Sequence, residues 1–263
     1  MSEPQFKVST PAKTQIARAF GLKAHHYDAN AFIQKELLSR LDFQFIEDSP
    51  GKMWADLGCG TGMSVELIRQ KGICSQILGI DIAFESLRFL KSRGLSNTFS
   101  LLGDIEHLPL KNNSLDGAIL TSVLQWFSSP SAVLKSISDL LKSKGILLFA
   151  TFTEGSFAEL NYTKKESGFP IPVFLPDQKN ICSLLKKAGF TILNTNMFAS
   201  TLYFPSAFIL LKSLSAIGGT AVSGNRMSRK ALFDFCKKFE ENFKSDKGVP
   251  ISYRALIGSA RKG

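Results

Sequence analysis

The stretch Lys52-Met-Trp-Ala-Asp-Leu-Gly-Cys-Gly-Thr-Gly62 decides the fold of this 263-residue chain. Its apolar run, which ends at Asp56, is typical of a buried strand in a parallel sheet. We expect Gly58, Gly60 and Gly62 to turn the chain sharply into a helix and to let a ligand approach the backbone. That ligand would face the positive end and the unpaired N–H groups of the helix. The spacing Gly-x-Gly-x-Gly differs from the dinucleotide-binding fingerprint Gly-x-Gly-x-x-Gly.

Two further apolar segments end in a carboxylate. The segment 75–81 is predicted to be a strand ending at Asp81, about 20 residues past the glycines, where an acid can accept hydrogen bonds from both hydroxyls of a ribose. A third strand, 98–103, is followed by Asp104 and Ile105, which we expect to cover an adenine ring. The three strand ends therefore predict one nucleoside site at the carboxyl edge of a parallel sheet.

In this order, the glycine loop, Asp81 and Asp104 resemble the class I S-adenosylmethionine-dependent methyltransferases, whose first motif is an Asp-x-Gly-x-Gly-x-Gly loop. The resemblance implies a Rossmann-like α/β fold with a seven-stranded, mostly parallel sheet, and S-adenosyl-L-methionine as the cofactor. A Rossmann-like domain that has lost its ligand is the alternative. The cofactor-binding residues that the resemblance implies are Tyr27, Gln34, Asp56, Gly58, Cys59, Gly60, Gly62, Asp81, Ile82, Asp104, Ile105 and Leu120.

The rest of the chain predicts alternating strands and helices. Residues 12–46 are expected to be mainly helical, with a break between Gly21 and Asp28. Strands are expected at 52–57, 75–81, 98–103, 115–121, 145–152 and 190–198. Helices are expected at 62–71, 84–93, 131–142 (capped by Lys144-Gly145) and 177–188 (capped by Gly189).

Helices at 205–217 and 228–243 and a closing strand at 251–260 complete the prediction. The resemblance to methyltransferases implies that this last strand lies antiparallel beside the sixth. About fifty residues between the last two strands are too many for a hairpin, so we expect a helical cap insertion over the carboxyl edge of the sheet. The predicted units are an N-terminal helical segment over the cofactor site (1–46), a cofactor-binding core (47–200), the cap (201–247) and the closing strand (248–263).

Charge is unevenly distributed along the chain. The net charge is +10, and residues 205–263 hold 11 Lys or Arg against 4 Asp or Glu. Such a basic region suits nucleic acid, an anionic membrane or an acidic protein, and it is also compatible with a solvated face that has no partner. The first 20 residues show no secretory signal, and the scattered cysteines suggest neither a zinc site nor disulfides. We therefore expect a cytoplasmic protein with no metal site and no membrane-spanning segment.

The acceptor of the methyl group determines which catalytic residues are needed. The sequence offers no obvious general base beyond His25, His26 and Tyr27, and no Asn-Pro-Pro-Tyr motif follows the fourth strand. A carboxylate acceptor needs no base, because it is already ionised at neutral pH.

Several segments resemble the malonyl-acyl-carrier-protein O-methyltransferases of biotin synthesis. These segments are Ala19-Phe20, Tyr27-Asp28-Ala29-Asn30-Ala31 with Gln34, Gly103-Asp104-Ile105-Glu106-His107-Leu108-Pro109, Leu124-Gln125-Trp126, Phe152 with Gly155-Ser156-Phe157 and Glu159-Leu160, and Leu211-Lys212-Ser213-Leu214-Ser215-Ala216-Ile217-Gly218. Leu120-Thr121 stands where the family usually has Ser-Asn, and Lys212 and Ser215 stand where it has Arg and Lys.

This resemblance implies methyl transfer to the free carboxylate of a malonyl thioester on acyl carrier protein, for pimeloyl synthesis. Tyr27, Gln125 and Trp126 are then expected at the reacting groups, although Tyr27 and Trp126 suit core packing as well. Contacts to the substrate or to the acidic carrier are expected from His25, Lys212, Arg226 and Arg229, whose alternative is an ordinary solvated surface.

Two other functions stay open at this point. One is a class I methyltransferase that acts on a small molecule or on RNA, although no RNA-binding module is visible in the sequence. The other is a protein that binds S-adenosylmethionine without catalysing a reaction.

Overall fold

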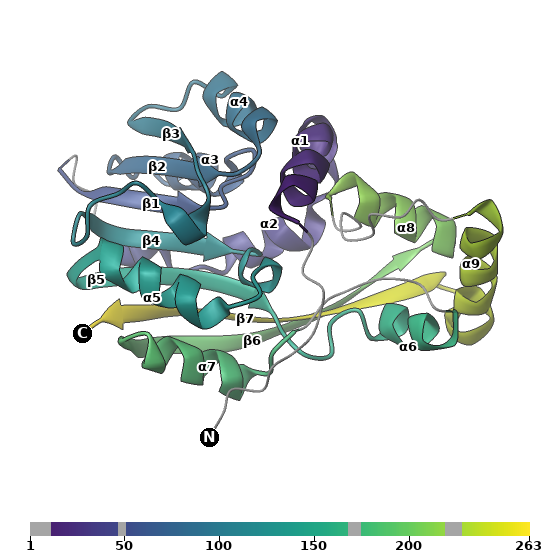
Figure 1. The fold of residues 1–263 in the computed structure, drawn as a ribbon. Coiled ribbons are helices and arrows are strands. Elements are labelled where there is room, and N and C mark those ends of the chain that lie inside the picture. Colours follow the sequence, from purple (N-terminus) through teal and green to yellow (C-terminus); the bar gives the residue numbers. More distant parts are fainter. Residues whose placement is uncertain (1–11, 47–50, 168–174, 219–227) are drawn as a thin grey trace.

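The computed structural model describes residues 12–46, 51–167, 175–218 and 228–263 (Figure 1). Its centre is a seven-stranded sheet in the order β3-β2-β1-β4-β5-β7-β6. The strands are β1 (Met53–Leu57), β2 (Gln76–Asp81), β3 (Thr98–Leu102), β4 (Leu115–Thr121), β5 (Leu141–Phe152), β6 (Phe190–Phe204) and β7 (Val249–Lys262). The first five strands pair in parallel, and β7 lies antiparallel between β5 and β6. The predicted fold class is confirmed.

Helices cover both faces of the sheet because successive strand residues point to opposite sides. Trp54 and Ile119 face a cluster with α2 (Phe32–Ser39), α3 (Met63–Gln70) and α4 (Phe84–Ser92). Ala55 and Leu120 face α5 (Pro130–Leu140) and α7 (Gln178–Lys187). The central strands β1 and β4 are largely buried on both faces. In such a sheet a ligand binds at the carboxyl edge.

The N-terminal segment differs from the prediction. A single helix, α1 (Lys13–Asn30), runs through the expected break, and the chain bends only at Ala31 before α2. Gly21 stays helical because it packs against α4, where a Cβ would lie 3.6 Å from the Cβ of Glu85. The glycine therefore marks a close approach of two helices, and the predicted break was wrong.

Two element ends were also predicted incorrectly. Helix α5 ends at Leu140, and Leu141 pairs at once with Leu115 of β4, so Lys144-Gly145 is part of β5 and not a helix cap. Strand β6 continues to Phe204 because β7 pairs with it along its whole length. Gly189 does cap α7, since its N–H bonds the Lys186 carbonyl at a φ of 90°.

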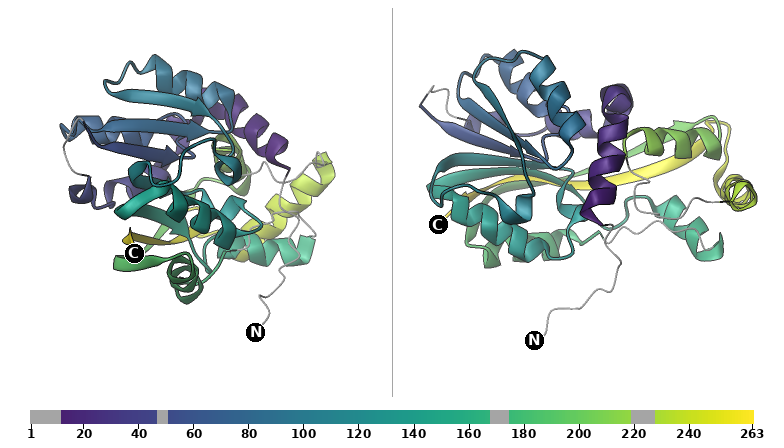
Figure 2. Two further views of the ribbon diagram at one scale, coloured as in Figure 1. Left: turned by 60° about the vertical axis from the view of Figure 1, so that its left-hand side comes forward. Right: turned by 45° about the horizontal axis from the view of Figure 1, so that its top comes forward.

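The long strands β6 and β7 project beyond the rest of the sheet as a ribbon, and three helices pack on it (Figure 2). These helices are α6 (Ala158–Ser167), which was not predicted, α8 (Ala207–Ala216) and α9 (Arg229–Phe243). Phe235 and Phe239 of α9 are completely buried in the core cluster that also includes Tyr253 of β7. Helix α8 also packs against α1, which connects the ribbon helices to the carboxyl edge of the sheet.

Short 3₁₀ helices complete the described part of the chain: η1 (Phe43–Phe45), η2 (Ile105–His107) and η3 (Leu124–Trp126). Two of them, η2 and η3, follow β3 and β4 at the carboxyl edge. No helix in the described ranges is both long enough and apolar enough to cross a membrane.

Candidate functional site

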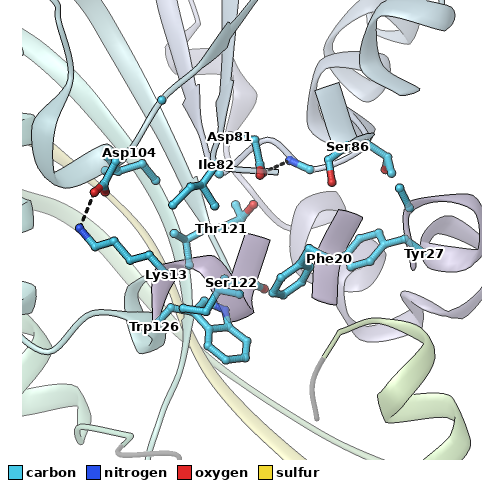
Figure 3. Close-up of a pocket in the computed structure, with 18 of the residues that line it drawn as sticks. Lys13, Phe20, Tyr27, Asp81, Ile82, Ser86, Asp104, Thr121, Ser122 and Trp126 are labelled. Atoms are coloured by element: carbon cyan, nitrogen blue, oxygen red, sulfur yellow. Dashed lines mark hydrogen bonds and ion pairs between the residues drawn. The ribbon is translucent and has the colours of Figure 1, made fainter. Parts of the chain in front are cut away.

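A pocket lies between α1 and the carboxyl ends of the central strands (Figure 3). Its empty space, open mouth included, is about 850 Å³, which lies within the usual size of small-molecule sites. The lining residues come from α1 and from the loops after β1 to β4: Lys13, Ile16, Phe20, Ala24, Tyr27, Gly58, Gly60, Thr61, Asp81, Ile82, Ser86, Gly103, Asp104, Ile105, Thr121, Ser122, Val123, Trp126 and Phe127.

The glycine loop has the conformation that its sequence predicts. Gly58, Gly60 and Gly62 all have positive φ, at 75°, 52° and 87°. A Cβ on Gly58 would lie 2.5 Å from Val123, and one on Gly62 would lie 2.4 Å from Leu90. A Cβ on Gly60 would meet no atom within 4 Å, because it would project into open space at the pocket wall. Two of the glycines therefore allow close packing of the protein, while Gly60 leaves room for a ligand.

Asp81, at the end of β2, holds this loop from below. Its carboxylate accepts hydrogen bonds from the backbone N–H groups of Gly60 at 2.8 Å and Ala83 at 2.7 Å. Burial raises the pKa of Asp81, and the bonds from backbone N–H groups act in the opposite direction. Because each carboxylate oxygen has a second lone pair, the side chain can still accept bonds from a ligand in the pocket.

Asp56 lies beneath the loop and outside the lining of the pocket. Its side chain is buried, and it accepts a hydrogen bond from the Ser64 hydroxyl. Burial raises the pKa of Asp56 to about 7, the Ser64 bond lowers it, and the nearby charge of Asp81 raises it again. Asp56 therefore connects β1 to the first turn of α3 and is only partly ionised near neutral pH.

Stability is expected to depend on pH through Asp56. The unfolded carboxyl has a pKa near 4 and the folded one near 7, so the unfolded chain binds fewer protons between these values. The free energy of unfolding therefore falls as pH rises from about 4 to about 7, by at most about 4 kcal/mol from this group. We expect Asp56→Asn to be more stable relative to the wild type at pH 8 than at pH 5, measured by urea unfolding. An equal difference at both pH values would contradict the prediction.

Asp104 lines the pocket, but its carboxylate is ion-paired. Lys13, at the start of α1, forms ion pairs with both Asp104 and Glu106. Partial burial alone would raise the pKa of Asp104, but Lys13 and the Glu106 backbone N–H lower it overall. Asp104 also caps η2 by accepting the Glu106 N–H at 3.0 Å. The amino end of α1 is thereby fixed to the loop after β3.

The other end of the pocket is aromatic. The ring of Phe20 meets Trp126 edge to face, with centroids 5.6 Å apart, and lies 6.2 Å from the ring of Tyr27. Burial raises the pKa of Tyr27, and the charges of Asp81 and Asp28 raise it further. The Tyr27 hydroxyl therefore stays protonated at neutral pH. Gln125 does not line the pocket; its amide nitrogen donates to the Ser122 carbonyl at 2.8 Å.

Ser122 is strained and carries an unsatisfied hydroxyl. Its φ is 56°, a conformation that L residues other than Asn and Asp seldom adopt. Its backbone N–H bonds the Ala150 carbonyl at 2.8 Å, while its buried hydroxyl has no hydrogen-bond partner in the described part of the chain. Strained backbone and unsatisfied groups gather at functional sites.

Removing the backbone strain and the unsatisfied hydroxyl at Ser122 is expected to stabilise the protein. Ser122→Gly relieves the positive φ and deletes the hydroxyl, so we expect the Tm to rise by roughly 2–4 °C for each kcal/mol gained. Ser259→Ala is a matched control because it deletes another buried, unpartnered hydroxyl, on β7, without a backbone change. Differential scanning calorimetry measures both. A lower Tm for Ser122→Gly than for the wild type would contradict the prediction.

The structure brings eight of the expected site residues together and leaves the others outside the pocket lining. Inside are Tyr27, Gly58, Gly60, Asp81, Ile82, Asp104, Ile105 and Trp126. Outside are His25, Gln34, Asp56, Cys59, Gly62, Leu120, Gln125, Lys212 and Arg229. Arg226 falls outside the described residues.

Some of the outside residues have evident structural contacts. His25 packs edge to face on Phe89 of α4, with centroids 4.5 Å apart. Cys59 and Leu120 are buried in the core, and burial raises the pKa of the Cys59 thiol. Lys212 and Arg229 are exposed on α8 and α9.

Of the residues of α1 that cover the pocket, Tyr27 was predicted from the sequence as a site residue and the four others were not. Lys13, Ile16, Phe20, Ala24 and Tyr27 recur at spacings of three and four residues, so they share one face of a continuous helix. The predicted break after Gly21 concealed this periodicity. A scan for helical spacing through the glycine would have found it.

Comparisons with known proteins agree with this geometry. A family described as "Methyltransferase domain" matches residues 55–149. A malonyl-acyl-carrier-protein O-methyltransferase of Hamiltonella defensa is 30% identical, and the match covers 98% of each chain. The chain belongs to this methyltransferase family. Another member, from Yersinia pestis, is 30% identical over 94% of this chain and 90% of its own length.

The solved structures bear on the fold alone. A Bacillus halodurans protein described as a methyltransferase superposes with a TM-score of 0.61 at 15% identity, covering 84% of this chain and 96% of its own. Family membership makes the chain an S-adenosylmethionine-dependent O-methyltransferase.

The pocket fits S-adenosyl-L-methionine. Gly60 leaves open space at the wall, and Asp81 keeps free lone pairs beside it. The apolar side chains of Ile82 and Ile105 line the same region, which suits an adenine ring.

Proposed function

We propose that this methyltransferase esterifies the free carboxylate of a malonyl thioester carried by acyl carrier protein, giving the methyl ester used in pimeloyl and biotin synthesis. The relatives' names supply the substrate, and one observation in this chain supports it: among the described residues that line the pocket, none is a free general base. S-adenosylmethionine, when bound, supplies a methyl group on a sulfonium cation, which an ionised carboxylate attacks without losing a proton.

The titratable groups of the pocket are each engaged or unsuited to take a proton. Tyr27 stays protonated because its pKa is raised by burial and by nearby carboxylates. Lys13 and Asp104 are paired with each other. Burial raises the pKa of Asp81, but this carboxylate already accepts bonds from two backbone N–H groups, and we assign its remaining lone pairs to the cofactor. A phenol or amine acceptor usually needs a general base. Because the described titratable groups of the pocket are otherwise engaged, an acceptor that is already ionised is favoured.

The residue roles follow from position in the pocket. We propose that the glycine loop and Asp81 hold the cofactor, with Ile82, Asp104 and Ile105 around its adenine. We propose that Tyr27 and Trp126, at the aromatic end, orient the acceptor and exclude water from it. Gln125 would act indirectly, because its amide nitrogen donates to the Ser122 carbonyl at 2.8 Å and so fixes the turn at Ser122.

The carrier itself is expected to meet the basic C-terminal region. Residues 205–263 hold 11 Lys or Arg against 4 Asp or Glu, and Lys212 and Arg229 are exposed on the helices that pack beside α1 and the ribbon. Complementary charge speeds association with an acidic protein and orients it.

The free thiols of the four cysteines support a reducing, cytoplasmic setting.

Methyl-labelled S-adenosylmethionine tests the proposal. We expect label in malonyl-acyl carrier protein as an alkali-labile methyl ester, and none in the carrier bearing an acetyl group. Label in tRNA or in a free small molecule would instead indicate another methyltransferase. Tight cofactor binding with no turnover on any of these substrates would indicate a protein that binds without catalysis.

A further inference from the structure

Arg93, at the C-terminal end of α4, joins four segments of the chain through one side chain. Its Nε donates to the Thr61 carbonyl at 2.7 Å, and its Nη1 donates to a Glu66 oxygen of α3 at 2.5 Å. Its Nη2 forms an ion pair with Asp28 of α1. The Arg93 side chain is only 17% exposed, so these bonds are partly shielded from water. This is a forked geometry that only Arg among the cationic side chains provides.

Asp28 closes the arrangement into a ring of contacts. Its second oxygen accepts a hydrogen bond from the Thr61 hydroxyl at 2.5 Å. Thr61 is buried and follows Gly60, and both residues line the pocket. Asp28 directly follows Tyr27, whose ring lies in the same pocket. The position of α1 and the position of the glycine loop are therefore set by the same polar cluster.

The opposite end of α1 is held by a different cluster. Lys13 pairs there with Asp104 and Glu106, but its side chain is 40% exposed. The acids that pair with Arg93 are no more buried than those that pair with Lys13, since Asp28 and Glu66 are 38% and 40% exposed while Asp104 and Glu106 are 27% and 22% exposed. The two clusters differ in bonding: Arg93 uses three nitrogens on three partners, whereas Lys13 holds two carboxylates with a single ammonium group. It is the Arg93 cluster that joins α1 to the glycine loop.

We propose that Arg93 is a positioning residue, which holds α1 over the glycine loop so that the covering helix and the cofactor site form one unit. Arg93 does not line the pocket, so its effect reaches the ligand only through Thr61, Asp28 and Tyr27. A ligand beneath α1 is then retained as long as the cluster is intact. The proposal concerns cofactor retention and does not depend on the identity of the methyl acceptor.

The test compares Arg93→Gln, Arg93→Lys and Asp28→Asn with Arg88→Gln. Arg88 lies on α4 itself and, among the described residues, its guanidinium pairs with Glu85 alone, at the surface, which makes its variant a matched control. Calorimetry measures S-adenosylhomocysteine affinity, and hydrogen–deuterium exchange measures protection of residues 13–30. The double variant Asp28→Asn with Arg93→Gln tests whether both residues act through the same contact.

For Arg93→Gln we expect S-adenosylhomocysteine affinity to fall roughly 10- to 100-fold, as for the loss of bonds to a charged group. Faster exchange confined to α1 should accompany the loss, and saturating ligand should restore protection. The affinity of Arg93→Lys should lie between those of the wild type and Arg93→Gln. The double variant should bind S-adenosylhomocysteine no more weakly than the weaker of the two single variants.

Two outcomes would overturn the proposal. One is unchanged affinity in Arg93→Gln and Asp28→Asn. The other is a loss of affinity that comes with faster exchange over the whole chain, which would give Arg93 a purely structural role. If Arg93→Gln does not fold, Asp28→Asn still decides, because it leaves the Arg93 bonds to Thr61 and Glu66 in place.

Discussion

Replacing Asp81 with Ala is expected to weaken S-adenosylhomocysteine binding by at least about 100-fold, because two hydrogen bonds from a ribose to a charged acceptor are lost. The same change leaves the backbone N–H groups of Gly60 and Ala83 without their acceptor, so the loop that lines the pocket loses its support. The loss should appear in Kd and in the KM for S-adenosylmethionine.

The variant Asp81→Asn separates the two effects. The N–H groups of Gly60 and Ala83 bond different oxygens of Asp81, so Asn keeps an acceptor for one of them and places its NH2 group toward the other. We therefore expect a loss of affinity that is smaller than in Asp81→Ala but still measurable. Asp116→Asn is the control, because Asp116 also accepts a backbone N–H, from Met53 at 2.9 Å, but lies at the amino end of β4. Calorimetry on all three variants is decisive, and wild-type affinity in Asp81→Ala would remove Asp81 from the cofactor site.

The strand ends could be predicted because their signals are local. An apolar run followed by a carboxylate or by glycines indicates both a buried strand and its functional end. Asp81 and Gly60 were located in this way, and the structure brings them within 2.8 Å of each other. The closing strand was predicted from the family resemblance, and β7 pairs antiparallel with β6 despite the long segment between them.

The covering helix was harder to predict because its glycine is explained only by a neighbour. Gly21 reads as a break in isolation, yet in the structure it lets α1 approach Glu85 of α4. Tertiary packing here outweighs the low helix propensity of glycine, which is about 1 kcal/mol. Ala24 lies within the predicted break and lines the pocket, so its place on the covering face of α1 was not predicted.

Ion clusters between distant segments could not be found from spacing. Arg93 and Asp28 are 65 positions apart, and Lys13 and Asp104 are 91 apart. Nothing in the sequence distinguishes these charges from the many exposed ones on the same helices. Asp104 shows the consequence: its place after β3 was predicted, but its pairing with Lys13 was not.

The second large effect is expected at Gly60, where the question is whether the open space beside the loop belongs to the cofactor. Gly60→Asn adds a side chain to a position whose Cβ meets no atom within 4 Å. Asn tolerates positive φ better than other L residues, so the backbone cost at a φ of 52° is small. We therefore expect a folded protein that has lost S-adenosylhomocysteine binding, by about 100-fold or more, because the new side chain occupies ligand volume.

Gly72→Asn is the matched control for this prediction. Gly72 also has a positive φ, at 77°, and open space around its Cβ, but it lies on the surface after α3 and away from the pocket. Both variants should show nearly the same small change in Tm, whereas only Gly60→Asn should lose affinity. Equal affinity in the two variants would mean that the cofactor does not pass close to the loop. Because both positions have a positive φ and open space around the added Cβ, the backbone strain is similar in the two variants. Any difference in affinity therefore comes from the pocket volume beside Gly60.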